Sequence, residues 1–426
     1  MNKSAPFANF DKHTQQYLNL VQEIVDKYNA IGSVEDRTKV GRIRVFGKEL
    51  IFSMTDGSFP LITCKHVPFR LMKEELVWFL DGSTNVSSLG TNNHIWDKWA
   101  LKEDHVRWIP CSPSEHFADF FNKDHSLWER LVKFPEALVG YWNKKHVYRK
   151  GDIGPMYGKT WRDFDGVDQI QEVFNLLATQ PFSARACVSA WDPKNFPITD
   201  PEIPELESDY TFQVTNGKMA LNPCHAFFQF LGEPMTLKDR CKWILNANNT
   251  GFKSMALSCK EIFGFSTYEE VDNLVLSPAK EEILTDYLDA CGVPCIFLSL
   301  KLTQRSCDLG LGAPFNIASY ALLLNMFAMS LNYAVKDLIY SLGDCHLYSN
   351  QIKTMTEMLE AAKESEEIFA SPYLETGFTN SNQVAVVIPY PWEQFKYEVF
   401  GEGDKFKIWE LGGYKSLGVF KMEVAA

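Results

Sequence analysis

One cysteine of this sequence stands where a reactive thiol could be held, in the run NPCH at 222–225. Pro223 restricts the backbone just before Cys224, and an apolar, strand-like stretch follows His225, so we expect the thiol at a loop-to-strand junction. Cysteine attacks only as its thiolate, which a neighbouring cation stabilises. Judged from this pair alone, a buried structural cysteine is the more common case.

Two further segments could supply proton transfer and anion binding. Glu75 falls in the apolar helical row of Met72, Leu76 and Phe79, where partial burial would raise its pKa toward the range useful for proton transfer. An exposed Glu75 paired with a lysine explains the pattern equally well. The run QRSCD at 304–308 combines a guanidinium, a hydroxyl and a carboxylate, which suit a phosphate and a polar ring, although surface loops often look similar.

The elements expected to position these groups alternate between helix and strand. Helical spacing predicts helices over 13–29, ended by Gly32, and over 68–80, and a nearly all-apolar helix over 319–331. Residues 42–53, followed by Asp56-Gly57, predict strands joined by a turn. Core strands are expected at 184–191, 218–231 and 338–342, the last running into a polar stretch at 343–350. Segments 101–150 and 232–294 are interpreted as insertions in a single catalytic domain spanning 1–426.

Composition restricts the class of protein. With 46% hydrophobic and 14% aromatic residues, the chain can build a sizeable core. Its formal net charge of -12 argues against a general nucleic-acid binder. Ten scattered cysteines without paired metal-type spacing predict a reducing cytoplasm and no metal site. The N-terminus lacks the apolar stretch of a signal peptide, and polar residues interrupt 320–335, so neither secretion nor membrane spanning is expected.

Taken together, a series of motifs resembles the thymidylate synthase family, in the family's order and across most of the chain outside the two insertions. The motifs are DRT at 36–38, FPLITCK at 59–65, ELVWFL at 75–80, IWDKW at 95–99, GPMYGKTW at 154–161, VSAW at 188–191, NPCHAFFQF at 222–230, QRSCD at 304–308, PFNIASY at 314–320 and GDCHLYSN at 343–350. The resemblance implies an α/β (α+β) fold with a large twisted, mostly antiparallel or mixed sheet and packed helices, forming a homodimer through the sheet.

The resemblance also implies a reaction. Cys224 would add to C6 of dUMP, so that C5 becomes a carbanion equivalent and attacks the methylene group of 5,10-methylenetetrahydrofolate, the cosubstrate. Glu75 would handle protons through ordered water, His225 would help to polarise a ring oxygen, and Tyr157 would assist removal of the C5 proton. Asn316 matches the position that reads the pyrimidine edge, which favours dUMP over dCMP.

Further binding residues follow from the same resemblance. The nucleotide phosphate would be bound by Arg37, Arg305 and Ser306, with Arg185 from the other subunit of the dimer. His346 and Tyr348 would hold the ribose hydroxyl, and Gln304 would also contact the nucleotide. The reduced folate would contact Lys65, Glu75, Trp96, Trp99, Asp308, Leu311, Gly312 and Phe315. Asp308 is counted with the catalytic residues as well.

The sequence departs from the family in two places. The family's Ser-Arg-Arg phosphate motif reads SAR at 183–185, so one intersubunit arginine is replaced by Ala184. The ending, with its Tyr-x-Pro-His-Pro signature, reads GYKSLG at 413–418. Because that tail normally excludes water, its alteration favours the phage deoxyuridylate hydroxymethyltransferases of the family, whose product is 5-hydroxymethyl-dUMP. Thymidylate synthase is the alternative, followed by a dCMP hydroxymethylase and by a non-catalytic nucleotide-binding relative.

Overall fold

The computed structural model describes residues 6–35, 40–110, 143–246, 250–376 and 409–422. These residues pack as two compact units. The first unit comprises residues 1–82, 160–191 and 223–426, and the second comprises 83–159 and 192–222. Each unit is described by itself below.

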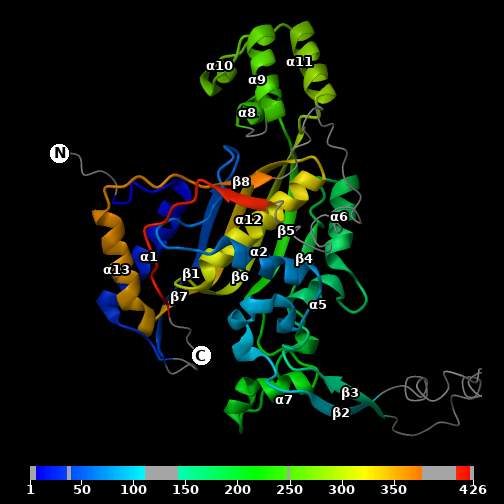
Figure 1. The fold of residues 1–426 in the computed structure, drawn as a ribbon, viewed down its shortest axis with the longest axis vertical. Helices are drawn as coiled ribbons and strands as arrows, with labels where there is room; N and C mark the ends of the chain where they lie inside the picture. Colours follow the sequence, from blue (N-terminus) through cyan, green and yellow to red (C-terminus); the bar gives the residue numbers. More distant parts are fainter. Residues whose placement is uncertain (1–5, 36–39, 111–142, 247–249, 377–408, 423–426) are drawn as a thin grey trace, which may run out of the picture. The chain divides into compact units, whose positions relative to one another are not determined.

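A five-stranded mixed sheet organises the first unit (Figure 1), with strand order β1-β7-β6-β5-β4. The strands are β1 (Arg42–Ser53), β4 (Cys187–Ser189), β5 (His225–Pro234), β6 (Ile296–Asp308) and β7 (Ala334–Tyr348). Only β6 and β7 run parallel, and every other neighbouring pair is antiparallel. The prediction of a mostly antiparallel, mixed sheet with packed helices is therefore confirmed.

Helices cover one face of this sheet. α12 (Gly312–Ser330) packs on β6, β7 and α2 (Phe69–Leu80), while α1 (Lys12–Ile31) packs on β1 and α13 (Ile352–Glu364). α12 is buried on nearly all sides, which explains why it shows no polar face. α1 is bounded as the sequence predicts, because the Asp11 carboxylate accepts hydrogen bonds from the amides of His13 and Thr14, and Gly32 ends the helix with a φ of 72°. α6 (Gln169–Thr179) packs beside β4.

The other face of the sheet carries exposed apolar side chains, and we call it the open face. Phe46 is 82% exposed and Ile51 49% exposed on β1, and Phe227 and Leu231 are partly exposed on β5. Between them, the Glu49 carboxylate accepts hydrogen bonds from the Lys301 ammonium at 3.0 Å and from the Ser341 hydroxyl at 2.5 Å.

Three strand predictions were wrong in their bounds. The strand expected at 184–191 is only the short β4, Cys187–Ser189. Strand β7 does not stop at 342 but continues to Tyr348, since Gly343 lets the backbone pass Arg305: a Cβ atom there would lie 2.8 Å from the Arg305 carbonyl oxygen. Strand β5 begins only at His225, seven residues after the predicted start, because 218–224 is irregular. Asp56 and Gly57 lie in a turn as predicted, but no second strand follows it before α2.

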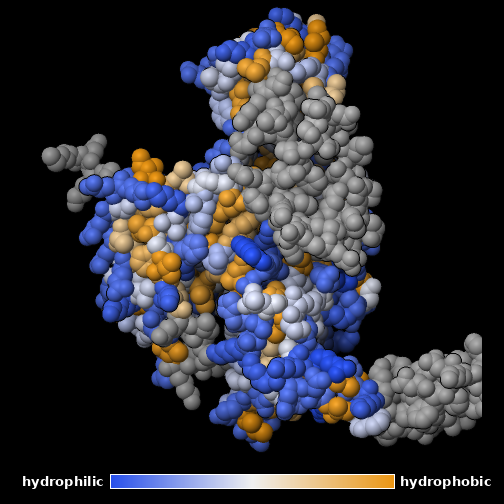
Figure 2. Space-filling view, viewed as in Figure 1, coloured by the Kyte–Doolittle hydropathy of each residue, from blue (hydrophilic) through white to orange (hydrophobic). Residues whose placement is uncertain are grey.

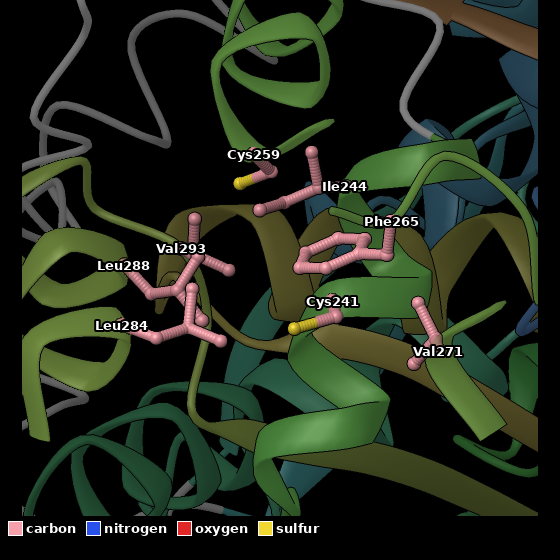
Figure 3. Packing of buried hydrophobic residues seen from close by; sticks show 8 residues of the cluster. All are labelled: Cys241, Ile244, Cys259, Phe265, Val271, Leu284, Leu288 and Val293. Carbon is pink, nitrogen blue, oxygen red and sulfur yellow. The ribbon is translucent and has the colours of Figure 1, made fainter. Parts of the chain in front are cut away.

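The predicted insertion at 232–294 contains a helical module with its own core. Its helices are α8 (Leu237–Asn246), α9 (Thr250–Phe263), α10 (Tyr268–Asp272) and α11 (Pro278–Ala290). Eight buried side chains from these helices and their loops pack together in its centre, as Figure 3 shows. Apolar side chains also remain on its surface, at the top of Figure 2; Val275 is 91% exposed. The insertion therefore packs around its own small core.

The second unit is built mostly from short elements. The antiparallel ribbon of β2 (His105–Pro110) and β3 (Asn143–Tyr148) falls in the other predicted insertion, whose residues 111–142 lie outside the described part of the chain. The unit also contains the short helices η1 (Val86–Ile95), η2 (Asp97–Trp99), η4 (Pro193–Asn195), η5 (Pro204–Ser208) and α7 (Tyr210–Thr215). α5 (Tyr157–Arg162) continues from this unit into the first.

The remaining elements of the first unit are η6 (Ser349–Gln351), β8 (Tyr373–Thr376) and β9 (Trp409–Gly412). Among the described helices, none combines the length and the apolar character that crossing a membrane requires. The described residues also contain no cluster of three or more His, Cys, Asp or Glu side chains that could bind a metal ion.

Candidate active site

Cys224 lies at the loop-to-strand junction that the sequence predicts, one residue before β5 begins. Pairing of β5 with β6 brings Arg305 beside it: the Arg305 amide donates to the Cys224 carbonyl at 2.9 Å, and its Nε donates to the Pro223 carbonyl at 2.7 Å. The guanidinium also stacks over the ring of Trp191, 5.4 Å from its centroid. The site thus sets a thiol next to a cation held in place on two sides.

Burial raises the pKa of the Cys224 thiol. The Arg305 guanidinium opposes it by favouring the thiolate. The resting site therefore holds a protonated thiol near neutral pH, and the proton must leave as Cys224 attacks.

The raised pKa predicts a pH dependence for alkylation of Cys224 by iodoacetamide. A group with a raised pKa stays protonated to higher pH, so the rate should climb about tenfold per pH unit and still be rising at pH 9. Mass spectrometry of the peptide containing Cys224 gives the rate, with free glutathione as the reference thiol. A plateau below about pH 8.5, the ordinary cysteine value, would contradict the buried thiol.

His225 is a neutral imidazole in this site. Burial lowers its pKa to about 3, and its Nδ1 lies 2.8 Å from the hydroxyl of Tyr320, which is also buried. Aromatic rings enclose the pair: Phe79 lies 5.9 Å from His225, and Phe228 lies 5.3 Å from Tyr320, between ring centroids. When the Tyr320 hydroxyl donates to Nδ1, Nε2 carries the proton and can donate to an oxygen of the substrate without adding charge.

A second group of charges surrounds the end of β6. Asp308 accepts hydrogen bonds from the Gln351 amide at 3.0 Å and from the Leu311 backbone at 3.1 Å. Burial raises its pKa, while Gln351, His346 and Lys65 act in the opposite direction. Lys65 is itself buried, with a lowered pKa, and donates to the Gly310 carbonyl at 2.6 Å. These contacts hold the turn between β6 and α12 against the sheet.

The predicted sugar-binding residues lie on the neighbouring strand β7. The parallel register places Asp308 opposite His346, and the rings of His346 and Tyr348 meet edge to face with centroids 5.0 Å apart. His346 is 2% exposed, and its Nδ1 lies 3.2 Å from the Asp344 carbonyl. The sheet thus brings together residues that are far apart in the sequence.

The other predicted residues of the first unit occupy varied surroundings. Gln304 is buried, and its amide donates to the Ser306 carbonyl and accepts from the Tyr340 hydroxyl. Arg185 is exposed, and its guanidinium contacts Gln180 and Ser183. Glu75 is half-buried on α2, as the apolar row suggested. Leu311 lies in the turn after β6, and Gly312, Phe315 and Asn316 lie at the start of α12.

Three predicted residues belong to the second unit, and one lies outside the described residues. Within that unit, Trp96 contacts both Trp99 and Tyr157, with ring centroids 5.6 and 6.1 Å apart. Arg37 falls in the segment 36–39, outside the described part of the chain. The roles of all these residues in binding stay predictions.

The altered C-terminal segment packs on the FPLITCK loop. The Tyr414 hydroxyl accepts from the Val67 amide at 2.8 Å and lies 3.1 Å from the Lys65 carbonyl. Two backbone bonds, from Leu417 to Thr63 and from His66 to Gly418, continue this pairing. The C-terminal segment departs from the family's usual ending, but it still packs beside the buried Lys65.

Sequence reasoning missed several residues that shape the site. Tyr320, Trp191 and Asp344 stood inside recognised motifs but received no role, and Gln351 directly follows the last motif. The feature that could have identified them is their position within or next to long motifs that contain reactive residues. What each one touches depends on contacts between distant segments, such as the pairing of His225 with Tyr320 across 95 residues.

Comparison with known proteins places this site in context. The family model described as thymidylate synthase matches residues 15–257 and 253–408. Proteins named thymidylate synthase from Francisella tularensis subsp. holarctica, strains FTNF002-00 / FTA, OSU18 and LVS, are each 31% identical to this chain over 396 residues. Each alignment covers 92% of this chain and 98% of the relative.

Proposed function

Since the chain belongs to the thymidylate synthase family, which uses methylenetetrahydrofolate as cosubstrate, we propose that it transfers the folate's one-carbon unit to C5 of dUMP, with Cys224 as nucleophile. The observation that carries the proposal is the Cys224 thiol set beside the anchored Arg305 guanidinium. A cation in that place stabilises the thiolate and can also bind a phosphate.

The residues around Cys224 then take distinct parts. The thiolate adds to C6, and neutral His225, oriented by Tyr320, donates to the ring oxygen where negative charge develops. Half-buried Glu75 moves protons through water, and Asn316 selects uracil. Arg305 and Ser306 bind the phosphate, and His346 and Tyr348 bind the sugar. Tyr157 assists loss of the C5 proton. Asp308, Leu311, Gly312, Phe315, Lys65, Trp96 and Trp99 contact the folate.

For the product we propose 5-hydroxymethyl-dUMP. Loss of the folate from the first adduct leaves an exocyclic methylene at C5, which takes hydride from tetrahydrofolate to give thymidylate, or water to give the hydroxymethyl group. In either case Cys224 then leaves C6, which restores the ring double bond and the free thiol. The tail decides between them by excluding or admitting water. The ending GYKSLG, bound to the FPLITCK loop through Tyr414, lacks the family's usual closing signature and favours water.

The test is mass spectrometry of the nucleotide formed from dUMP and methylenetetrahydrofolate, with dCMP in parallel. A hydroxymethyl product supports the proposal. Thymidylate with dihydrofolate would replace it by reductive methylation, the second candidate, which the names of the relatives favour. Reaction on dCMP alone would contradict the role of Asn316, and the absence of any product or adduct would point to a non-catalytic nucleotide-binding relative.

We further propose that two copies associate through the open face, each contributing Arg185 to the other's phosphate site. The support is the uncovered apolar side chains on β1 and β5, and Arg185 exposed beyond β4. Ala184 leaves Arg185 as the one arginine of this segment that could cross the interface.

A charge on the open face is expected to separate the two copies. Phe46→Asp should weaken self-association about 100-fold or more, because a symmetric dimer would bury the new carboxylate twice. Sedimentation velocity over a concentration series measures the change. Val275→Asp, on the insertion module, is the matched control and should leave association unaltered. A wild-type protein that stays monomeric at micromolar concentration would contradict the proposal.

A further inference from the structure

The carboxylate of Asp344 lies against the imidazole of His346. His346 Nδ1 is 3.2 Å from the Asp344 carbonyl oxygen and 3.5 Å from Asp344 Oδ1. A carbonyl oxygen only accepts hydrogen bonds, and so does an ionised carboxylate. The pKa of Asp344 is lowered by His346, Arg42 and Arg44, which outweigh the effect of burial, so this carboxyl is ionised at neutral pH. Both neighbours therefore require a proton on Nδ1.

Two arginines of β1 hold the same carboxylate from its other side. The Nη1 atoms of Arg42 and Arg44 lie 3.4 and 3.6 Å from Asp344 Oδ2. Strand pairing brings them there, since Arg44 is the cross-strand partner of His346 and Phe46 that of Asp344. Asp344 Oδ1 is buried and has no hydrogen-bond partner among the residues that the structure describes. The imidazole 3.5 Å away is in place to satisfy it with a small shift.

We propose that Asp344, braced by Arg42 and Arg44, is a positioning residue that keeps the His346 proton on Nδ1 and so leaves Nε2 to accept a hydrogen bond from the 3′-hydroxyl of the deoxynucleotide. The inference rests on the proposed function, in which His346 binds the sugar. Tyr348, packed edge-on against the imidazole, limits rotation of the ring.

This arrangement selects for a hydroxyl at the 3′ position. A buried acceptor left without its donor costs binding free energy, so a nucleotide that lacks the 3′-hydroxyl should bind less well. If Asp344 positions His346, removing the charge of Asp344 should reduce the preference for the nucleotide that has the 3′-hydroxyl. If Asp344 only supported the fold, its replacement would weaken binding of the nucleotides with and without the 3′-hydroxyl equally.

The test compares dUMP with 2′,3′-dideoxyuridine monophosphate in wild type and in Asp344→Asn. We expect the wild-type preference for dUMP to fall about tenfold, through KM, while kcat at saturation changes less than about twofold. Asp337→Asn makes the same chemical change earlier on β7 and should keep the preference. Equal losses for both nucleotides, or an unchanged preference in Asp344→Asn, would overturn the proposal.

A second measurement keeps the inference separate from the proposed reaction. 15N NMR of histidine-labelled, ligand-free protein reports the tautomer directly, with His346→Gln identifying the signal. We expect Nδ1–H in wild type and a shift toward the other tautomer or a mixture in Asp344→Asn. Nε2–H in wild type would overturn the role of Asp344 even if turnover is found. If neither nucleotide binds to wild type, the proposed function fails, whereas the tautomer still tests the pairing.

Discussion

Replacing Cys224 with alanine is expected to eliminate the covalent nucleotide adduct and to lower turnover by about 10⁴-fold or more, since Cys224 is the group proposed to activate C5 through addition at C6. The Arg305 amide donates to the Cys224 carbonyl, and the next residue, His225, pairs with Tyr320. Release of tritium from 5-tritiated dUMP follows turnover, and mass spectrometry of the intact protein follows the adduct.

The matched control is Cys295→Ala, which removes an exposed thiol at the start of the β6 region. It should leave both the adduct and the turnover as in wild type. Binding of dUMP to Cys224→Ala, measured by calorimetry, should persist, because the phosphate and sugar contacts remain. Turnover in Cys224→Ala within tenfold of wild type would show that another residue is the nucleophile.

Arg305→Lys is expected to raise the KM for dUMP about 100-fold, the second largest effect. Lysine keeps a positive charge but loses the planar fork that can bind a phosphate at two points while Nε stays bonded to the Pro223 carbonyl. Lysine keeps the positive charge that lowers the pKa of Cys224, so alkylation of Cys224 at a fixed pH should stay close to the wild-type rate.

Deoxyuridine, which has no phosphate, separates phosphate binding by Arg305 from its contact with the loop at Pro223. If the guanidinium binds the phosphate, wild type and Arg305→Lys should differ far less with the nucleoside than with dUMP. Lys280→Met removes an exposed cation from α11 of the insertion module and should leave the KM near the wild-type value. An equal loss on nucleoside and nucleotide would assign Arg305 to the loop at Pro223 alone.

Much of this protein could be predicted from short stretches of sequence, because their effects are local. The proline before Cys224 predicts the junction that holds the thiol, and Asp11 and Gly32 set the ends of α1 through bonds within a single turn. The motifs also predicted the thymidylate synthase family, to which the chain belongs, since long runs such as NPCHAFFQF and GDCHLYSN are specific.

Only the tertiary structure decided the state of those residues. His225 is neutral because distant segments bury it beside Tyr320, and the Cys224 thiol has a raised pKa because β6 and the residues around it exclude water. Likewise, β7 continues through a polar stretch because pairing with β1 and β6 supplies hydrogen-bond partners for its backbone. No local sequence pattern encodes that pairing. Chemical identity lies in the residues themselves, whereas pKa and orientation arise from neighbours that the fold brings into contact.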